Sequence, residues 1–522
     1  MTNQAGSKTM HTQPSRFVRA AATVGLSFGA LEASAQSLGS GDTAWVATST
    51  VLVLFMTIPG LALFYAGMVR ASAVVTLLLQ CFVVACLVTV LWVVAGYSLA
   101  YGESLGFVGD LGKALYAGVG EGALWNTIPE SLFATFQVTF AIITPALVVG
   151  ALVERIRFAA VLLFAALWSL LVYAPVAHWV WGGGWLGDLG VLDYAGGLVV
   201  HATAGTAALV VAIAMGPRPG FPDRLPPPHS MPFAVAGAAM LWVGWLGFNG
   251  GSAIGANADA AMAITVTHIA AAAGALSWLL VEWWWHGKPR ALGAITGAIG
   301  GLASVTPTAG FVGPAAALVI GASGGVLCLL AQQGLRRVLK LDDALDVVAV
   351  HLVGGTLGTL LAGVFASSAL GVFSGEADIA ILGQVRTQLV GVMATVLYTF
   401  AVTRMILAVV NVVIRERVSE QTLADGLDKT FHAERGYVFL AQNPPRAADR
   451  SSQPDRSSQP DRSSQPDRSS QPDHSPQPDH SPQPDHSPQS GRSPELDILP
   501  ELDRLLEPDR PPAAGRAPGP ET

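Results

Sequence analysis

The sequence predicts an all-α membrane protein with eleven membrane-spanning helices. Only 12% of the 522 residues are charged and 51% are hydrophobic, whereas an ordinary soluble domain carries about 25% charged residues. The apolar residues gather in long runs, each sufficient for a helix to cross about 30 Å of hydrocarbon. The runs are far longer than the ~10 alternating residues of a barrel strand, so strands are not expected.

The predicted spans follow one another along most of the chain, at 43–68, 73–101, 131–152, 158–180, 194–216, 231–250, 259–285, 291–309, 312–333, 345–368 and 385–412. The 57 glycines fit this prediction, because helices in lipid associate by close packing and small residues permit it. Cys81, Cys86 and Cys328 all lie within these runs. We expect them to be small buried side chains and not a disulfide or metal framework.

Residues 1–35 have the pattern of a cleaved secretory signal. Arg16 and Arg19 precede a short apolar stretch at 20–31, and the Ala-Ser-Ala sequence at 33–35 provides a cleavage site. The alternative is an uncleaved amphipathic leader, since the segment is too short to be the first span. Either interpretation places the mature N-terminus outside the cell.

The distribution of basic residues predicts the same orientation. With eleven spans the termini lie on opposite sides, and cytoplasmic loops carry an excess of Lys and Arg. If the N-terminus is outside, the outer loops carry only Lys113 and Arg386. The inner loops then carry Arg70, Arg155, Arg157, Arg218, Arg224, Lys288, Arg290, Arg336, Arg337, Lys340, Arg415 and Arg417. The C-terminus is therefore predicted to be cytoplasmic.

Two histidines within apolar spans indicate an internal symmetry. His201 in the fifth span and His351 in the tenth each follow an aspartate by eight residues, Asp193 and Asp343. Because a five-helix unit has an odd number of spans, a second copy enters the membrane inverted, which predicts inverted repeats of spans 1–5 and 6–10 plus a separate eleventh span. Either histidine alone could be a packing residue, but two at equivalent positions favour a shared pathway, since ionisable groups at mid-membrane are costly.

Several longer motifs resemble the ammonium transporter (Amt/Mep/Rhesus) family over about residues 43–440. They are FMTIPGLALFYAGMVR (55–70), GALVERIRF (150–158), AHWVWGGG (177–184), DYAGGLVVH (193–201), GWLGFNGGSA (244–253), VTPTAGFVG (305–313) and GLDKTFHAERGY (426–437). The resemblance implies an eleven-helix bundle at 43–412 that usually forms a homotrimer with one pore per subunit. It also implies a bacterial Amt-type protein of the inner (plasma) membrane that serves nitrogen uptake.

The resemblance assigns the residues of an ammonium path. Trp181, Phe140 and Ser252 match the family's outer cation site, where cation–π attraction and hydrogen bonds replace water. Phe140 and Phe248 match its two gating rings. Without the motifs, Trp181 would be interpreted as an interfacial belt residue and Phe140 as core packing.

Beyond the gate, the resemblance implies that ammonium loses its proton and that ammonia passes His201 and His351, because a bare charge in a narrow apolar passage is expensive. The proton could follow the histidines or a water wire, and separate movement of the proton would make transport electrogenic. Asp193 has two interpretations that are compatible: an N-cap of the fifth span, and long-range stabilisation of the cation at the outer site.

The C-terminal region divides in two. Residues 413–440 resemble the family's regulatory segment, which implies a PII-class signal protein as a cytoplasmic partner, and the alternative is a simple end-cap on the bundle. Residues 441–522 contain six-residue repeats, first RSSQPD and then HSPQPD, and many of the 33 prolines of the chain. This composition cannot form a core and predicts a disordered low-complexity tail.

Other functional classes are disfavoured. An enzyme would need a nucleophile–base pair or metal ligands at one depth, so we expect no catalytic activity, no metal and no cofactor. No basic stripe points to nucleic acid, and the lipid bilayer is the expected surrounding. An ammonium sensor and a passive ammonia gas channel remain as alternatives on the same scaffold.

Overall fold

The computed structural model describes residues 37–368, 379–414 and 417–437. The expected signal segment at 1–35 and low-complexity tail at 441–522 lie outside these residues.

Within the described residues, eleven helical segments are long and apolar enough to cross a membrane, which confirms the predicted number. Several are composite, with an α-helix continued through a π-helical or 3₁₀ turn (η). In chain order, the elements of the first five spans are α2 (Ser40–Phe55), η1 (Met56–Leu61) and α3 (Ala62–Met68); η2 (Ala71–Ala73), α4 (Val74–Leu91), η3 (Trp92–Gly96) and α5 (Tyr97–Tyr101); α6 (Glu130–Leu152); α7 (Phe158–Trp168), η5 (Ser169–Tyr173), α8 (Ala174–Trp181) and α9 (Trp185–Asp188); η6 (Gly197–Ala202) and α10 (Thr203–Met215).

The remaining six spans are α11 (Met231–Gly251); α12 (Ala258–His286); α13 (Ala291–Val305) and η7 (Thr306–Thr308); α14 (Pro314–Gln333) and η8 (Gly334–Val338); η9 (Val348–Leu352) and α15 (Val353–Phe365); and α16 (Ile381–Val413). Three kinds of element lie outside the spans. They are the short turn η4 (Ala114–Tyr116), an antiparallel hairpin of the two-residue strands β1 (Leu124–Trp125) and β2 (Ile128–Pro129), and the helices α17 (Glu420–Asp425) and α18 (Leu427–His432).

Local sequence explains where these helices begin and bend. The Ser230 side chain accepts a hydrogen bond from the Phe233 N–H and caps α11, and Asn257 caps α12 through the Ala260 N–H at 2.9 Å. Pro59 lies inside the first span, where it has no N–H to donate, and the backbone there forms the π-turn η1.

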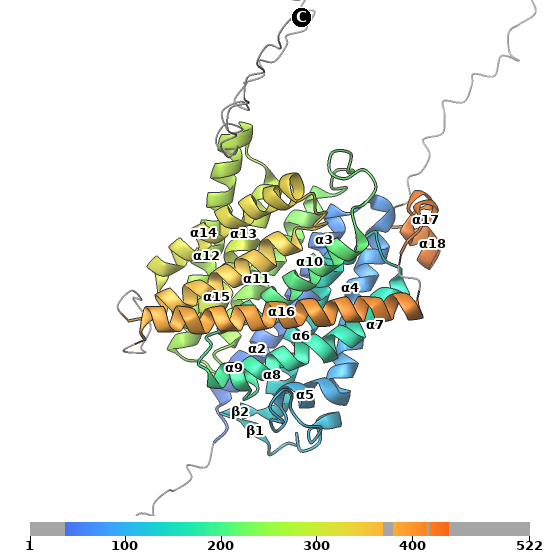
Figure 1. Cartoon of the computed structure of the whole chain (residues 1–522). Helices are drawn as coiled ribbons and strands as arrows, with labels where there is room; N and C mark the ends of the chain where they lie inside the picture. Colours follow the sequence, from blue (N-terminus) through green and yellow to red (C-terminus); the bar gives the residue numbers. More distant parts are fainter. Residues whose placement is uncertain (1–36, 369–378, 415–416, 438–522) are drawn as a thin grey trace, which may run out of the picture. The chain divides into compact units, whose positions relative to one another are not determined.

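The spans alternate between two ends of the bundle. We call the end that carries the β1–β2 hairpin and α9 the hairpin end, and the end that carries α17 and α18 the tail end (Figure 1). The first span starts at the hairpin end, where Gly39 N donates to Thr127 O at 2.7 Å, and the eleventh finishes at the tail end. This alternation is the one expected for an odd number of spans.

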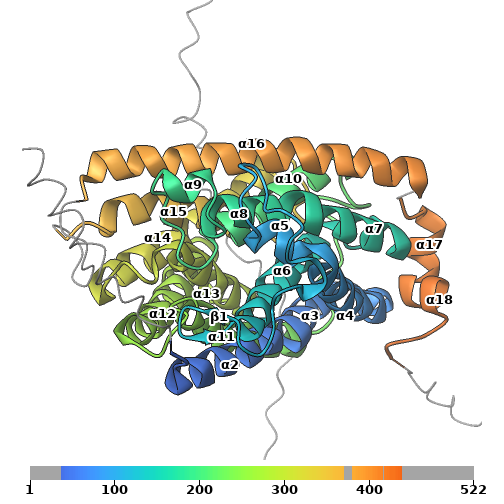
Figure 2. The same ribbon diagram turned by 90° about the horizontal axis from the view of Figure 1, so that it is seen from below.

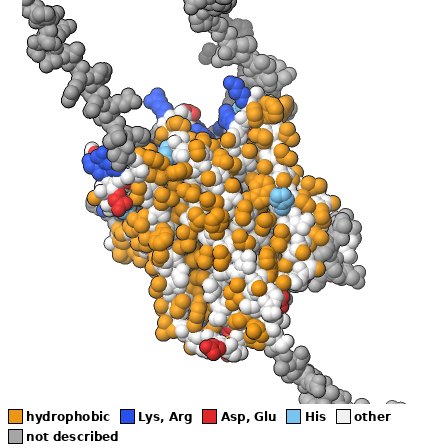
Figure 3. All heavy atoms as spheres, turned by 180° about the vertical axis from the view of Figure 1, so that it is seen from behind, with side chains coloured by type: hydrophobic (Ala, Val, Ile, Leu, Met, Phe, Trp, Pro, Cys, Tyr) orange, Lys and Arg blue, Asp and Glu red, His pale blue; other side chains and the backbone are white. Residues whose placement is uncertain are grey.

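The surface has the polarity of a membrane protein. Hydrophobic side chains cover the middle of the face seen in Figure 3, and Lys and Arg side chains gather at one end. Loops at the tail end hold most of the basic residues assigned above to inner loops, including Arg155, Arg218 and Arg336. Lys113 and Arg386 lie at the hairpin end. The two groups of basic residues, assigned above to inner and outer loops, therefore lie at opposite ends of the bundle.

The packing of the spans supports the predicted repeat. The first span packs against the sixth (α2, η1 and α3 on α11), and the fifth packs against the tenth (α10 on η9, and η6 on α15). The long helix α16 lies outside both sets and runs across α7, α10 and α15 (Figure 2). The eleventh span is thus an addition to two sets of five, as expected.

Two glycines allow the fifth and tenth spans to meet backbone to backbone. A Cβ at Gly205 would lie 2.2 Å from Leu352 N, and a Cβ at Gly355 would lie 2.6 Å from His201 Cβ. Each glycine follows its histidine by four residues, His201 and His351, so Asp, His and Gly recur with the same spacing in both spans. Close crossing at small residues is a common way for helices to associate in membranes.

One expectation from the sequence is wrong. Cys81 and Cys328 are buried as predicted, but Cys86 is exposed on the outside of α4. Side chains that face lipid are as apolar as buried ones, so an apolar run does not reveal which of its positions point inward.

We expect Gly205→Ala to lower the stability of the folded bundle by about 1–3 kcal/mol, because the added methyl must displace the backbone of the tenth span. Gly334→Ala is the matched control, since a Cβ there meets no atom within 4 Å and an alanine favours the helix. Thermal unfolding of the purified protein in detergent measures both. Equal melting temperatures for the two variants would show that the crossing is not tightly packed.

Candidate functional site

Asp193 fixes the start of the fifth span. Its carboxylate accepts four backbone N–H bonds, from Gly196 at 2.8 Å, Gly197 at 2.5 Å, Leu198 at 2.7 Å and Val199 at 3.1 Å. This is the contact that the capping interpretation requires. Burial raises the pKa of Asp193 above its usual value, and the four N–H donors oppose that rise.

Asp343 has the equivalent position before the tenth span. Its Oδ2 atom accepts from Val348 N at 2.8 Å and Ala349 N at 3.0 Å. In both spans the capped segment continues directly into a π-turn, η6 or η9, and the histidine lies within that turn. The wider turn is a frequent feature of functional positions in helices.

The two histidines meet at the crossing of these spans. His201 Nδ1 and His351 Nδ1 are 3.2 Å apart, and both side chains are almost completely buried. A hydrogen bond between two ring nitrogens needs one donor and one acceptor, so the pair shares one proton and can be neutral in both rings. The sequence predicted the equivalence of the two positions, and the geometry adds direct contact.

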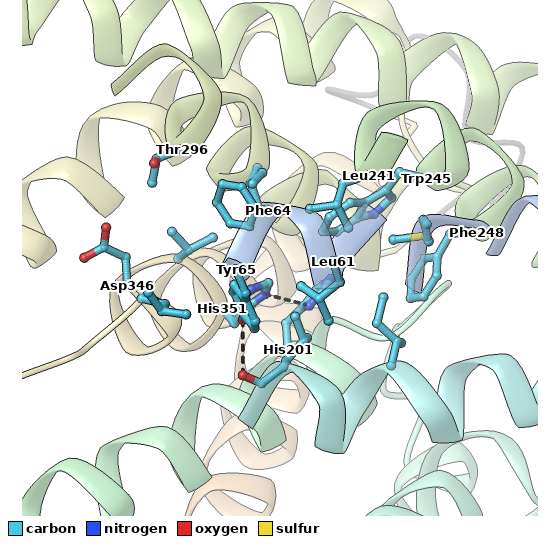
Figure 4. A pocket seen from close by; sticks show the side chains of 16 residues that line it. Leu61, Phe64, Tyr65, His201, Leu241, Trp245, Phe248, Thr296, Asp346 and His351 are labelled. Carbon is cyan, nitrogen blue, oxygen red and sulfur yellow. Dashed lines mark hydrogen bonds between the residues drawn. The ribbon is translucent and has the colours of Figure 1, made fainter. Parts of the chain in front are cut away.

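The histidines line a narrow cavity of about 20 Å³, which is about the space of one water molecule. Figure 4 shows the order along it, with Asp346 and Thr296 on the far side of His351 and Phe248 on the other side of His201. The remaining lining is largely apolar and consists of Met56, Leu61, Phe64, Tyr65, Ile143, Leu147, Leu241, Trp245, Ile299, Leu345 and Val350. A guest in this cavity meets few polar atoms besides the imidazoles.

Two phenylalanine rings close the end of this cavity that faces the hairpin end. The ring centroids of Phe140 and Phe248 are 4.2 Å apart with a 31° tilt, and both residues are buried. Phe248 lines the histidine cavity, and Phe140 lines a second, larger cavity on the other side. The ring pair therefore separates the two cavities.

The second cavity, which we call the vestibule, has a volume of about 330 Å³ at the hairpin end. Its wall includes the three residues expected at the cation site, Phe140, Trp181 and Ser252, together with Tyr101, Trp125, Phe133, Gln137, Val180, Tyr194 and Ile254. Trp181 meets Phe140 edge to face with centroids 5.9 Å apart, and Trp181 Nε1 donates to Asp193 O at 2.7 Å. Asp193 itself does not line the vestibule.

At the tail end, the cavity leads to a polar pocket of about 290 Å³ that includes Asp343 and Asp346. A buried ion pair supports its wall, with Arg155 Nη2 2.7 Å and Arg218 Nε 2.9 Å from Asp342 Oδ2. Burial opposes the charged form of Asp342, but the hydrogen bonds and charge of Arg218 and the charge of Arg155 hold its pKa at about 2. These contacts tie three loops together at the tail end.

Asp343 and Asp346, which also line the pocket, behave differently from Asp342. Burial raises the pKa of Asp343 to about 7, and the neighbouring charge of Asp346 adds to the rise. Burial also raises the pKa of Asp346 to about 6, and the Gln332 side chain, which donates to its Oδ2 at 2.7 Å, opposes that rise. Asp346 also has a positive φ of 58°, an uncommon backbone conformation for a residue other than glycine.

The sequence did not single out several residues of these cavities. Tyr65 and Trp245 line the histidine cavity, Asp346 lies at its tail-end side, and Trp125 and Phe133 line the vestibule. Their sequence signal is weak because each is one residue in a long apolar run or a loop. Among the described residues, no group of three or more His, Cys, Asp and Glu side chains comes together as a metal site would require.

The Ammonium Transporter Family matches residues 44–437. An ammonium transporter of Bacillus subtilis is 44% identical over 405 residues, which cover 76% of this chain and 98% of that protein.

Two solved structures are similar in fold. The crystal structure of Saccharomyces cerevisiae Mep2 has a TM-score of 0.66 at 35% identity and covers 74% of this chain and 92% of its own. A structure described as a Sensor Amt Protein has a TM-score of 0.69 at 27% identity, covering 74% of this chain and 97% of its own.

The raised pKa of Asp343 predicts a pH dependence of stability. Between the ordinary carboxyl pKa of about 4 and about 7, the folded protein keeps a proton that the unfolded chain has lost, so stability falls as pH rises through this window. Asp343→Asn keeps an oxygen that can accept the two N–H bonds but cannot titrate, so the fall should become shallower. Melting temperatures across this window test it, with the exposed Asp188→Asn as the control. An unchanged slope in Asp343→Asn would contradict the prediction.

Proposed function

The chain belongs to the ammonium transporter family, and we propose that it recruits ammonium in the vestibule, removes its proton near Phe140 and Phe248, and conducts ammonia past His201 and His351. Its relatives are named as transporters, and its eleven spans make it a multi-pass membrane protein. The detailed path is our inference from the arrangement of the two cavities.

The contact between the Phe140 and Phe248 rings is the main observation that supports this proposal. Phe140 and Phe248 stand between a vestibule of about 330 Å³ and a cavity of about 20 Å³. A hydrated cation fits the first volume and not the second. Any ion that continues must therefore lose its water where the two rings meet, and the loss of hydration decides which species can pass.

The vestibule offers partial replacement for that water. Trp181 and Phe140 present aromatic rings, and Ser252 provides a hydroxyl whose proton is already donated to Phe248 O at 2.9 Å. The Ser252 oxygen is thus oriented to accept a hydrogen bond from a cation. Ammonium can donate such a bond and potassium cannot, which gives a chemical basis for selecting between ions of similar size.

The histidine cavity suits ammonia better than ammonium. Its lining is largely apolar, and the two imidazoles share one hydrogen bond at 3.2 Å. His201 Nε2 has no hydrogen-bond partner among the described residues and remains available to a small guest. A neutral guest that donates or accepts one bond is accommodated here at low cost, whereas a full charge is not.

The proton left at the ring pair needs a separate route, and its transfer would make transport electrogenic. Asp193 acts on a cation in the vestibule only indirectly. Its backbone carbonyl accepts the Trp181 N–H and so positions the Trp181 ring, and its carboxylate acts through its long-range field.

We further propose that the hairpin end faces outward and the tail end the cytoplasm, in the inner (plasma) membrane. The protein would act as a homotrimer in nitrogen uptake.

We expect Trp181→Ala to raise the half-saturating ammonium concentration about 5- to 30-fold, the equivalent of about 1–2 kcal/mol for a desolvated cation–π contact. His201→Ala should alter the size of the current by removing the shared hydrogen bond. Ammonium-jump currents on proteoliposomes measure both effects. Trp284→Ala and His286→Ala, both on exposed positions of α12, are matched controls and should resemble the unmodified protein.

The outcomes distinguish the competing functions. A saturating inward-positive transient that changes in both site variants supports electrogenic transport along the proposed path. Ammonia equilibration without current would replace it with a passive gas channel. The absence of both would make sensing the leading function, an alternative that the similarity to the Sensor Amt Protein favours.

The segment 417–437 docks on the tail end in a way that supports a regulatory role. Asp428 accepts hydrogen bonds from Thr76 N at 2.7 Å and Val75 N at 3.1 Å at the start of α4. Val418 N donates to Arg155 O at 3.0 Å, next to the Asp342 ion pair. A partner that moves this segment would therefore act on loops that form the tail-end pocket.

We expect a PII-class signal protein to bind at this end. A pull-down with a purified PII protein, with and without its nucleotide effectors, tests the partner. Asp428→Ala should weaken capture, because it releases the segment from α4, and Asp188→Ala at the hairpin end is the control. No capture in any nucleotide state would count against a PII partner and leave the end-cap interpretation.

A further inference from the structure

Lys113 makes an unusual set of contacts at the hairpin end. Its ammonium group pairs with the Glu130 carboxylate at the start of α6. The same nitrogen lies 5.7 Å from the Tyr97 ring centroid and 5.8 Å from that of Trp125. Tyr97 O–H donates to Glu130 Oε1 at 2.7 Å, so the carboxylate is held by the residue whose ring faces the cation.

These groups are a recognition set for an ammonium cation. A carboxylate takes one N–H, and two electron-rich ring faces attract the remaining charge. The Glu130 side chain is only 9% exposed, and Glu130 is the first residue of α6. Without a cation beside it, this carboxylate would be a nearly buried charge with only the Tyr97 hydroxyl as a side-chain partner.

The framework of the site does not depend on the Lys113 side chain. The Lys113 backbone N–H donates to Ser98 Oγ at 2.9 Å, and Ser98 Oγ donates to Asp110 O at 2.8 Å. At the other side, Glu130 N donates to Ala123 O at 2.9 Å. Contacts that do not involve the Lys113 side chain therefore hold both the loop and the first residue of α6 in place.

The ring of Trp125 is fixed independently as well. It stacks on Phe133 with centroids 4.0 Å apart and an angle of 6° between planes, and it meets Tyr101 edge to face at 5.8 Å. Phe133, Tyr101 and Trp125 also line the vestibule. The Lys113 contacts thus lie behind the vestibule wall, and Trp125 is shared by both.

We propose that Glu130, Tyr97 and Trp125 form a second site for ammonium and small primary alkylammonium cations, and that Lys113 occupies it with its own ammonium group. The site is distinct from the Trp181, Phe140 and Ser252 cluster and does not depend on its proposed role. A tethered amine has a high effective concentration, so Lys113 keeps free cations out of the site in the unmodified chain. Shortening or neutralising the side chain opens it.

Two substitutions open the site to different ligands. Lys113→Met removes the charge, and its flexible thioether can turn aside so that ammonium itself reaches the carboxylate. Lys113→Ala ends at Cβ, so propylammonium replaces the missing atoms. Thermal unfolding of the purified protein is measured in sodium, ammonium and propylammonium chloride at equal ionic strength. We expect a saturable upward shift in melting temperature that is largest with ammonium for Lys113→Met and with propylammonium for Lys113→Ala.

Each shift is compared with the shifts of the unmodified protein and of Lys113→Arg, which both keep a cationic side chain at position 113. The shifts of these two proteins measure any binding of the cation elsewhere in the chain. Adding Glu130→Gln to either opened variant should abolish the excess shift, because the carboxylate is gone. An equal shift in opened and unmodified proteins, or a shift that survives Glu130→Gln, would overturn the proposal. If Lys113→Ala does not fold, the Lys113→Met pair with and without Glu130→Gln decides the question alone.

The test is independent of transport. It needs no membrane and no working pore, so a failure of the proposed transport path leaves it unaffected. Repeating the Lys113→Met titration with Trp181→Ala in the same chain separates the two sites. The excess shift should persist there, and its loss would mean that the cation binds in the vestibule instead.

Discussion

The crossing of the fifth and tenth spans is the contact on which the centre of this molecule depends. A Cβ at Gly205 would collide with the backbone at Leu352, and one at Gly355 would collide with His201. The absence of these two side chains brings the helix axes close enough for the imidazoles to share a hydrogen bond at 3.2 Å. The crossing supplies both imidazoles to the cavity, whose remaining wall comes largely from the first span, α6, α11 and α13.

The crossing also requires that both spans start at a defined residue. A helix that begins within the bundle leaves several N–H groups without partners, and no solvent is available there to satisfy them. Asp193 accepts four such bonds and Asp343 accepts two, so each aspartate fixes the register of the π-turn that contains the histidine. In each of the two spans, the aspartate cap therefore also sets the position of the histidine.

Sequence reasoning found the features that have a simple pattern. Run length predicted the spans, and the equal Asp-to-His spacing predicted that His201 and His351 hold equivalent positions. It could not give Tyr65 or Trp245, because a cavity-lining side chain in a membrane helix is as apolar as one that faces lipid. The same ambiguity produced the error at Cys86. The ion pair of Arg155 with Asp342 joins residues far apart in the chain, and only the fold brings them together.

The arrangement of polar groups along the path suggests how one protein can attract a cation and still exclude it. The vestibule and the tail-end pocket each have volumes of roughly 300 Å³ and contain charged or polar side chains, while the cavity between them holds about 20 Å³. Within that cavity the available polar atoms belong mainly to two imidazoles already bonded to each other. A cation entering it would exchange its hydration shell for a largely apolar lining. A neutral molecule loses far less on the same step, so on the proposed path the narrow, largely apolar cavity would favour ammonia over ammonium.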